Sequence, residues 1–264
     1  MGDCILNFTA DNYRSLGKTG IKVSPIGLGT VKIGRNTGLK YPLSFQLPTE
    51  IELQYLIEQT INLGINFIDT APAYGESETR LGNLLSKRRQ DWVICTKVGE
   101  VFENNTSSYN FTAKHCITSI ENSLKRLQTD YLDVVLVHCD NNDLEALAQS
   151  DVVNELKKFQ SRGYIRAIGA STKTVNAGRF AVENMDVVML GYNQADSSQS
   201  EVIAFAQQHG KGVLLKKIFA SGHSHDMSAA VRFALAPRGI ASAVVGTTNP
   251  LHLKENVYAS LTDC

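Results

Sequence analysis

Eight short apolar runs, most of them rich in β-branched residues, recur along the chain and alternate with longer segments of helical periodicity. Such alternation is typical of parallel strands joined by crossover helices. We expect the strands at residues 25–29, 66–69, 92–97, 132–138, 165–171, 187–192, 212–216 and 241–246. Eight pairs of strand and helix favour a closed (β/α)8 TIM barrel over an open doubly wound sheet, which more often has about five to seven strands.

The helical segments carry recognisable end signals. Gly64, Gly163 and Gly210 each follow a helical segment at the place of a left-handed C-cap, and Ser77 and Ser200 are expected N-caps. We expect the helices at residues 49–63, 78–88, 113–127, 152–163, 175–184, 200–210, 228–236 and 251–258.

All 264 residues, 1–264, are expected to form a single domain. No low-complexity linker divides the chain, and its length is close to the roughly 250 residues of a TIM barrel. Ahead of the first strand, Ser15–Val23 has the pattern of a β-hairpin around Gly17 and Gly20. We expect this hairpin to close the N-terminal mouth, the bottom, of the barrel.

Charge and cysteine content exclude several classes of protein. The chain has 26 basic and 26 acidic residues, which argues against nucleic acid as a partner. No secretory signal is recognisable, and no apolar stretch approaches the roughly 18 residues of a membrane span. The five cysteines are scattered and form no C-x-x-C pair, so neither a disulfide framework nor a metal cluster is indicated. We therefore expect a cytoplasmic protein with no membrane partner; its oligomeric state is not given by the sequence.

Three consecutive strands are expected to end in titratable residues. Asp69, Lys97 and His138 each close an apolar run, and the C-terminal ends of barrel strands face the mouth where barrel enzymes place their active sites. Tyr74 follows in a short loop that can bend over the same mouth. Lys97 is expected to lower the pKa of Tyr74, because a cation beside a phenol oxygen favours the phenolate. Asp69 would hold the lysine, and His138 would hydrogen-bond a carbonyl oxygen as it gains charge.

Each of these residues also has an ordinary structural interpretation. Asp69 could cap a loop, Lys97 and Tyr74 could line the rim, and His138 could be a hydrogen-bonded core histidine. Their occurrence together at three neighbouring strand ends nevertheless favours an active site that protonates an oxygen.

The segment GINFIDTAPAYGESETRLGNLL resembles the signature of the aldo-keto reductase family around its catalytic aspartate and tyrosine. The later segments VICTKVG, LDVVLVHCD, IRAIGAST, GYNQAD and VVGTTNPLHLKENV resemble the family's successive strand-end motifs in the same order. The resemblance implies a barrel that binds a nicotinamide nucleotide and reduces aldehydes or ketones to alcohols. It implies Tyr74 as the acid, with Lys97 and Asp69 tuning it, and His138 as the group that orients the carbonyl.

The resemblance also implies a site for the nicotinamide. The family holds the carboxamide with a serine, an asparagine and a glutamine; Ser171 and Gln194 match the first and last, and Thr172 stands at the asparagine position. Lys216 and Lys217 replace a stacking tyrosine and a serine after the seventh strand. These two lysines are either phosphate ligands or a solvated pair.

Two further segments are assigned to the cofactor. Ser221 lies ahead of residues 222–227, a shortened form of the loop that often closes over the pyrophosphate in the family. The adenosine segment near the C-terminus supplies Gly246, Thr247, Thr248, His252, Glu255 and Asn256. Within it, the positions of Gly246, Thr248 and His252 usually carry fixed cations that bind the 2′-phosphate. We therefore expect NADP(H), with NAD(H) as an alternative and selectivity within about tenfold.

These features predict an NAD(P)H-dependent oxidoreductase that reduces small carbonyl compounds. A nucleotide-binding regulatory or interaction protein that retains the fold is an alternative, suggested by Thr172 and Lys216. A barrel enzyme for phosphorylated sugars, suggested by the two lysines, does not explain the four clustered titratable residues. The substrate depends on loops 34–47 and 99–112, whose shapes the sequence does not give.

Overall fold

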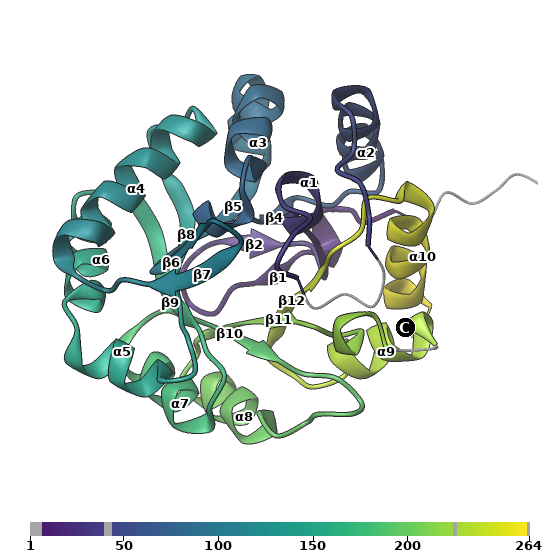
Figure 1. Ribbon diagram of the computed structural model, residues 1–264. Coiled ribbons are helices and arrows are strands. Elements are labelled where there is room, and N and C mark those ends of the chain that lie inside the picture. Colours follow the sequence, from purple (N-terminus) through teal and green to yellow (C-terminus); the bar gives the residue numbers. More distant parts are fainter. Residues whose placement is uncertain (1–6, 40–43, 224–225, 263–264) are drawn as a thin grey trace, which may run out of the picture.

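The computed structural model describes residues 7–39, 44–223 and 226–262. In this part of the chain, parallel strands close into a barrel in the order in which they occur along the sequence, and helices surround it (Figure 1). The barrel strands are β3 (Ile26–Gly29), β4 (Phe67–Asp69), β5 (Val93–Val98), β8 (Leu132–His138), β9 (Ile165–Ser171), β10 (Val187–Gly191), β11 (Gly212–Lys216) and β12 (Ile240–Val245). The predicted TIM barrel is confirmed, and every strand lies close to its predicted range.

Parallel pairing brings the expected active-site residues to one end of the barrel. Asp69 is the last residue of β4, Lys97 of β5 pairs with Leu136 of β8, and His138 at the end of β8 pairs with Ser171 at the end of β9. Because all the barrel strands run in the same direction, their C-terminal ends open onto the same mouth.

Helices cover the outside of the barrel (Figure 1). They are α1 (Val31–Gly34), α2 (Glu50–Asn62), α3 (Ser77–Leu85), α4 (Ala113–Leu127), α5 (Asp143–Gln149), α6 (Val152–Ser161), α7 (Val175–Asn184), α8 (Ser200–Gln208), α9 (Met227–Leu235) and α10 (Pro250–Leu261). Short 3-10 helices span Ala10–Asn12, Pro72–Tyr74, Ser86–Asp91 and Ala220–Gly222. The larger core lies where apolar helix faces pack on the outer faces of the strands. None of the helices in the described ranges is both long and apolar enough to cross a membrane.

The predicted helix ends are partly confirmed. Gly64, Gly163 and Gly210 follow their helices with φ angles of +69°, +82° and +65°, the left-handed conformation expected of a C-cap glycine. The N-cap predictions for Ser77 and Ser200 are wrong by one residue, because each serine is the first residue of its helix. The Ser77 hydroxyl donates to a buried threonine and that of Ser200 to a backbone carbonyl, so neither caps a helix.

A β-hairpin closes the bottom of the barrel, as predicted. Its strands are β1 (Arg14–Ser15) and β2 (Lys22–Val23), which pair antiparallel. Leu16 and Ile21 are buried among the inward-facing side chains of the barrel strands. Gly17 has a φ of +59°, and a Cβ on it would lie 2.4 Å from a backbone nitrogen of β11, so this contact requires glycine.

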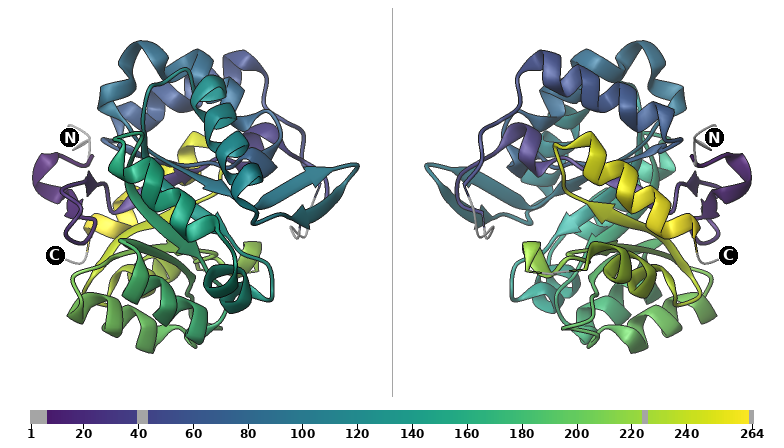
Figure 2. Two further views of the ribbon diagram at one scale, coloured as in Figure 1. Left: turned by 90° about the vertical axis from the view of Figure 1, so that its left-hand side faces the viewer. Right: turned by 90° about the vertical axis from the view of Figure 1, so that its right-hand side faces the viewer.

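A second hairpin, absent from the predicted elements, stands at the other end of the barrel. It consists of β6 (Glu100–Glu103) and β7 (Thr106–Tyr109), joined through Asn104 and Asn105 at positive φ. Figure 2 shows this hairpin projecting at the end of the barrel opposite the N-terminal hairpin. Its strands have only four residues each, and β6 (EVFE) follows β5 almost directly, so no apolar alternation marks them in the sequence.

Candidate active site

Lys97 and Asp69 form a buried ion pair inside the mouth. Lys97 is 2% exposed, and its Nζ donates to Oδ1 of Asp69 at 2.6 Å and to the carbonyl of Thr70 at 2.8 Å. Burial by itself lowers the pKa of Lys97, but the charge of Asp69 and the nearby Tyr74 outweigh it and raise that pKa. The strand ends therefore place a permanent positive charge below the mouth.

Tyr74 lies over this charge. It ends the 3-10 helix Pro72–Tyr74 in the loop after β4, and Nζ of Lys97 is 4.8 Å from the centroid of its ring. Burial raises the pKa of Tyr74 above its ordinary value, and the opposing effect of Lys97 is smaller. The expectation of a lowered pKa is therefore wrong for this structure. The phenol keeps its proton at neutral pH.

His138 completes the cluster. Its ring meets that of Tyr74 edge to face, with centroids 6.1 Å apart and planes at 85°. Burial lowers the pKa of the imidazole, while the adjacent Glu100 opposes that shift. The structure thus brings Asp69, Tyr74, Lys97 and His138 together, the same four residues that the sequence singles out.

Sequence reasoning missed two charged residues beside this cluster. Oε2 of Glu100, the first residue of β6, lies 2.8 Å from Nδ1 of His138. The two atoms are not aligned as in a good hydrogen bond, and they form an ion pair only when His138 is protonated. Ser107 donates to Oε1 of Glu100 at 2.6 Å, and Nη1 of Arg35 lies 3.6 Å from the same oxygen. The only sequence signal was a carboxylate two residues beyond the end of β5, which is common on any surface hairpin.

Lys216 and Ser171 meet across the mouth. They end β11 and β9, and Nζ of Lys216 donates to Oγ of Ser171 at 2.6 Å. Burial, together with the positive charges of Lys217, Lys97 and Lys173, lowers the pKa of Lys216 to about 7. Lys216 therefore changes its charge within the physiological pH range.

The other two expected carboxamide ligands differ in exposure: Thr172 is buried and Gln194 is exposed. Thr172 directly follows β9, and its Oγ1 is buried without a hydrogen-bond partner among the described residues. A buried hydroxyl left unpaired costs about 1–3 kcal/mol, which a ligand amide could offset. Gln194 is exposed in the turn after β10.

The remaining expected cofactor residues occupy connections at the C-terminal ends of the last two barrel strands. Lys217 and Ser221 follow β11, both with positive φ. Gly246, Thr247 and Thr248 follow β12, and His252, Glu255 and Asn256 lie on α10. Asn249 caps α10 by accepting from the backbone N–H of Leu251 at 2.9 Å. Of the shortened loop, residues 224–225 lie outside the described residues.

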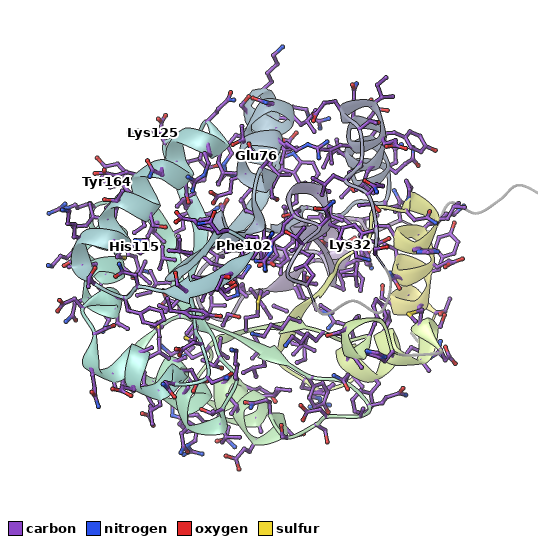
Figure 3. The ribbon with its side chains drawn as sticks, viewed as in Figure 1. Lys32, Glu76, Phe102, His115, Lys125 and Tyr164 are labelled. Atoms are coloured by element: carbon purple, nitrogen blue, oxygen red, sulfur yellow. The ribbon has the colours of Figure 1, made fainter. Side chains whose placement is uncertain are left out.

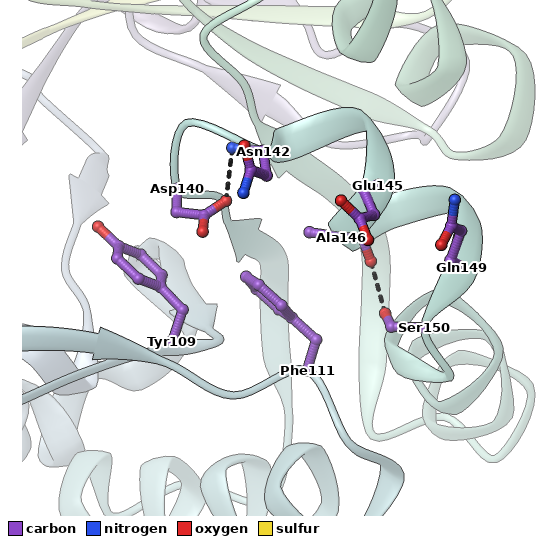
Figure 4. A pocket seen from close by; sticks show the side chains of 8 residues that line it. All are labelled: Tyr109, Phe111, Asp140, Asn142, Glu145, Ala146, Gln149 and Ser150. Atoms are coloured by element: carbon purple, nitrogen blue, oxygen red, sulfur yellow. Dashed lines mark hydrogen bonds between the residues drawn. The ribbon is translucent and has the colours of Figure 1, made fainter.

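A cavity of about 420 Å³ lies beside the mouth, between the end of β7 and α5 (Figure 4). It is lined by Tyr109, Phe111, Asp140, Asn142, Glu145, Ala146, Gln149 and Ser150. Asp140 is two residues beyond His138, so the cavity adjoins the cluster without containing it. In Figure 3, Phe102 and Lys32 lie over the mouth, whereas Lys125, His115 and Tyr164 lie on the outer layer.

Comparison with known proteins identifies the family. The model of the Aldo/keto reductase family matches residues 25–228, which is most of the chain. The chain belongs to the aldo-keto reductase family. A solved structure from Pseudomonas aeruginosa, assigned to the aldo-keto reductases, is 44% identical, with a TM-score of 0.90 and 98% of each chain covered.

Two curated relatives are named as a dehydrogenase and a reductase. L-galactose dehydrogenase from Arabidopsis thaliana is 28% identical over 95% of this aldo-keto reductase chain and 88% of its own length. Aldo-keto reductase YhdN from Bacillus subtilis is 36% identical over 66% of this chain and 49% of its own length. The family is one of reductases and dehydrogenases that act on small carbonyl compounds and their alcohols with nicotinamide nucleotides.

Proposed function

We propose that this aldo-keto reductase is an NAD(P)H-dependent oxidoreductase that reduces aldehydes or ketones to alcohols, with Tyr74 as the general acid. The observation that carries the proposal is the contact of Tyr74 with two different partners. The centroid of its ring lies 4.8 Å from Nζ of Lys97, and the ring packs edge to face with that of His138. A carbonyl oxygen between the phenol and the imidazole would accept from the phenol O–H and, when His138 is doubly protonated, also from its Nε2–H.

Tyr74 supplies the proton in this proposal. Because burial raises its pKa, the hydroxyl is protonated before reaction and can donate to an oxygen that gains negative charge. The phenolate that remains lies beside the ammonium of Lys97, which Asp69 holds at 2.6 Å. Lys97 therefore stabilises the product of proton transfer rather than ionising the resting tyrosine.

The residues around the mouth suit a nicotinamide nucleotide. The unpaired Oγ1 of Thr172 and the hydroxyl of Ser171 would bind the carboxamide, and the connection 246–249 ahead of α10 would bind the adenosine end. When bound, the reduced nicotinamide supplies a hydride to the carbonyl carbon. Lys216 already bonds Ser171, so it would lie against the ring or reach toward the phosphates.

Relatives support the reaction class without fixing the substrate. The name of the Arabidopsis relative describes oxidation of a sugar hydroxyl, and the same hydride transfer runs in reverse as carbonyl reduction. A small hydroxylated aldehyde is therefore a reasonable first substrate for this chain. The shape of the mouth is set partly by the β6–β7 hairpin.

The test has two stages. Titration calorimetry with NADPH and NADH should show binding of both, with dissociation constants within about tenfold of each other because 246–249 carries no fixed cation. Oxidation of the bound cofactor is then followed at 340 nm with a panel of aldehydes, ketones and aldoses. Binding without turnover on any of these would instead support the nucleotide-binding regulatory role. Absence of binding would contradict both.

A further inference from the structure

Glu100 is held in one position by contacts from three separate elements. His138 at the end of β8 lies 2.8 Å from its Oε2, Ser107 of β7 donates to its Oε1 at 2.6 Å, and Arg35 after α1 lies 3.6 Å from the same oxygen. These partners keep the carboxylate ionised: burial opposes its charge, but His138, Ser107 and Arg35 lower the pKa of Glu100 to about 2.

Arg35 connects this carboxylate to the loop that carries Tyr74. Its Nη1 donates to the carbonyl of Ala73 at 3.1 Å, and its guanidinium lies 3.2 Å from the centroid of the Phe102 ring in β6. Nε and Nη2 donate to the carbonyls of Thr37 and Gly38 at 2.9 Å each. A buried guanidinium with this many acceptors is fixed, so it places a fixed positive charge 3.6 Å from Glu100.

We propose that Glu100 is a positioning residue that fixes the imidazole of His138 and favours its doubly protonated form, so that Nε2–H can donate to the carbonyl oxygen. The proposal rests on the proposed carbonyl reduction. It assigns the β6–β7 hairpin a direct part in the reaction, beyond shaping the mouth.

The chemistry follows from which ring nitrogen Glu100 contacts. A carboxylate at 2.8 Å from Nδ1 favours a proton on that nitrogen. In a neutral imidazole with its proton on Nδ1, Nε2 is only an acceptor and cannot hydrogen-bond a carbonyl oxygen. His138 can therefore act as a donor to substrate only when both nitrogens carry protons.

Other charges near His138 act against this protonation. Lys97 of β5 and Lys216 of β11 both disfavour the imidazolium, and burial does so more strongly. Tyr74 faces the ring as a neutral phenol. Glu100 raises the pKa of His138, and removing its charge should leave the opposing effects of burial, Lys97 and Lys216 in place.

Glu100→Gln tests the proposal, because glutamine keeps the size and removes the charge. In NMR titrations of the free protein, with the His138 signal assigned from a His138→Asn variant, the imidazole should titrate at least about one pH unit lower in Glu100→Gln. In steady-state reduction, the alkaline limit of kcat should move down by the same amount, with KM for the cofactor changed little. At a pH above this limit, kcat should fall about tenfold relative to the unaltered protein.

Two companion variants separate this role from structural damage. Glu103→Gln removes an exposed carboxylate from the same strand and should leave both the His138 titration and the pH profile in place. Glu100→Asp retains the charge and should recover most of the His138 titration even if the hairpin is strained. An unchanged His138 titration in folded Glu100→Gln would overturn the proposal. A lowered titration in a protein that reduces no carbonyl compound would support the Glu100 contact and overturn the proposed function instead.

Discussion

Burial and the neighbouring cation Lys97 shift the pKa of Tyr74 in opposite directions. Lys97 favours the phenolate, but the loss of solvent around the ring is the larger effect and raises the pKa. A raised pKa keeps the phenol protonated but makes it a weaker acid, so Lys97, which favours the phenolate, must assist proton transfer to the carbonyl oxygen. The sequence predicted the four residues of the cluster correctly but could not predict this balance, since it depends on how deeply the loop Pro72–Tyr74 is buried.

Tyr74→Phe should lower kcat for carbonyl reduction by at least about a hundredfold, the usual scale for loss of a general acid. Because only a hydroxyl is removed, cofactor affinity and the midpoint of urea unfolding should change little. Single-turnover reduction of an aldehyde measures the effect, with Tyr55→Phe at an exposed position of α2 as the control. A near-normal single-turnover rate would remove Tyr74 from the mechanism.

Lys216 lowers the free energy of unfolding by an amount that depends on pH. Its pKa falls from 10.5 to about 7, so the folded protein binds fewer protons than the unfolded chain between these values. The destabilisation is complete below about pH 7 and disappears as pH rises towards 10.5. Lys216→Met should therefore raise the free energy of unfolding near pH 7 by on the order of 2 kcal/mol, a value reduced by the residual solvent exposure of the side chain.

Urea unfolding of the Lys216→Met variant at pH 6.5 and at pH 10 tests whether the stabilising effect of the substitution decreases as pH rises. The stability gained over the unaltered protein should shrink at the higher pH. Lys114→Met, at an exposed position on α4, is the matched control for removing a lysine. A gain of the same size at both pH values would mean that Lys216 is charged throughout.

At the scale of elements, the sequence predicted the repeated strands and helices of the barrel. It did not predict the β6–β7 hairpin or α5, which have no counterpart elsewhere in the repeat. Each barrel strand is a buried apolar run between turn residues, so its position is visible without any tertiary information. The β6–β7 hairpin and α5 (Asp143–Gln149) are short, and neither shows a run long enough to reveal its periodicity. Glu100 and Arg35 became recognisable only when the fold placed Glu100 beside His138 and Arg35 beside Glu100.

The Glu100 contact should make the hairpin sensitive to acid. Because the pKa of Glu100 is lowered from 4.5 to about 2, its carboxylate stabilises the folded state fully above about pH 4.5 and loses this effect as pH falls towards 2. Glu100→Gln should lower the free energy of unfolding by on the order of 2 kcal/mol at pH 6, and by progressively less below pH 4.5. Denaturant unfolding across this range, compared with Glu103→Gln, measures it; a deficit that stays constant down to pH 3 would contradict it.

In the whole molecule, the candidate active site and the hairpin that closes the barrel lie at opposite ends of the barrel. The titratable cluster and the connections proposed to bind the cofactor lie at the C-terminal ends of the strands, while the β1–β2 hairpin fills the N-terminal end (Figure 2). This polarity could be predicted from the sequence, because strand direction decides which end receives the residues after each strand. The details of substrate choice could not, since they depend on the loops around the mouth.

The two ends should therefore respond differently to substitution. Leu16 is 0% exposed and packs against the start of β11 at the bottom of the barrel. Leu16→Ala removes buried methyl groups and leaves a cavity, which should lower the free energy of unfolding by about 3 kcal/mol. The cluster at the opposite end keeps its neighbours, so kcat and KM below the unfolding temperature should change less than about twofold.

Ile51→Ala on α2, where the side chain is 82% exposed, controls for loss of an aliphatic residue and should cost little stability. Urea unfolding and steady-state kinetics on the same preparations decide the matter: a Leu16→Ala protein of normal stability would show that the hairpin does not seal the barrel, and a large loss of kcat in a folded variant would show that the two ends are coupled.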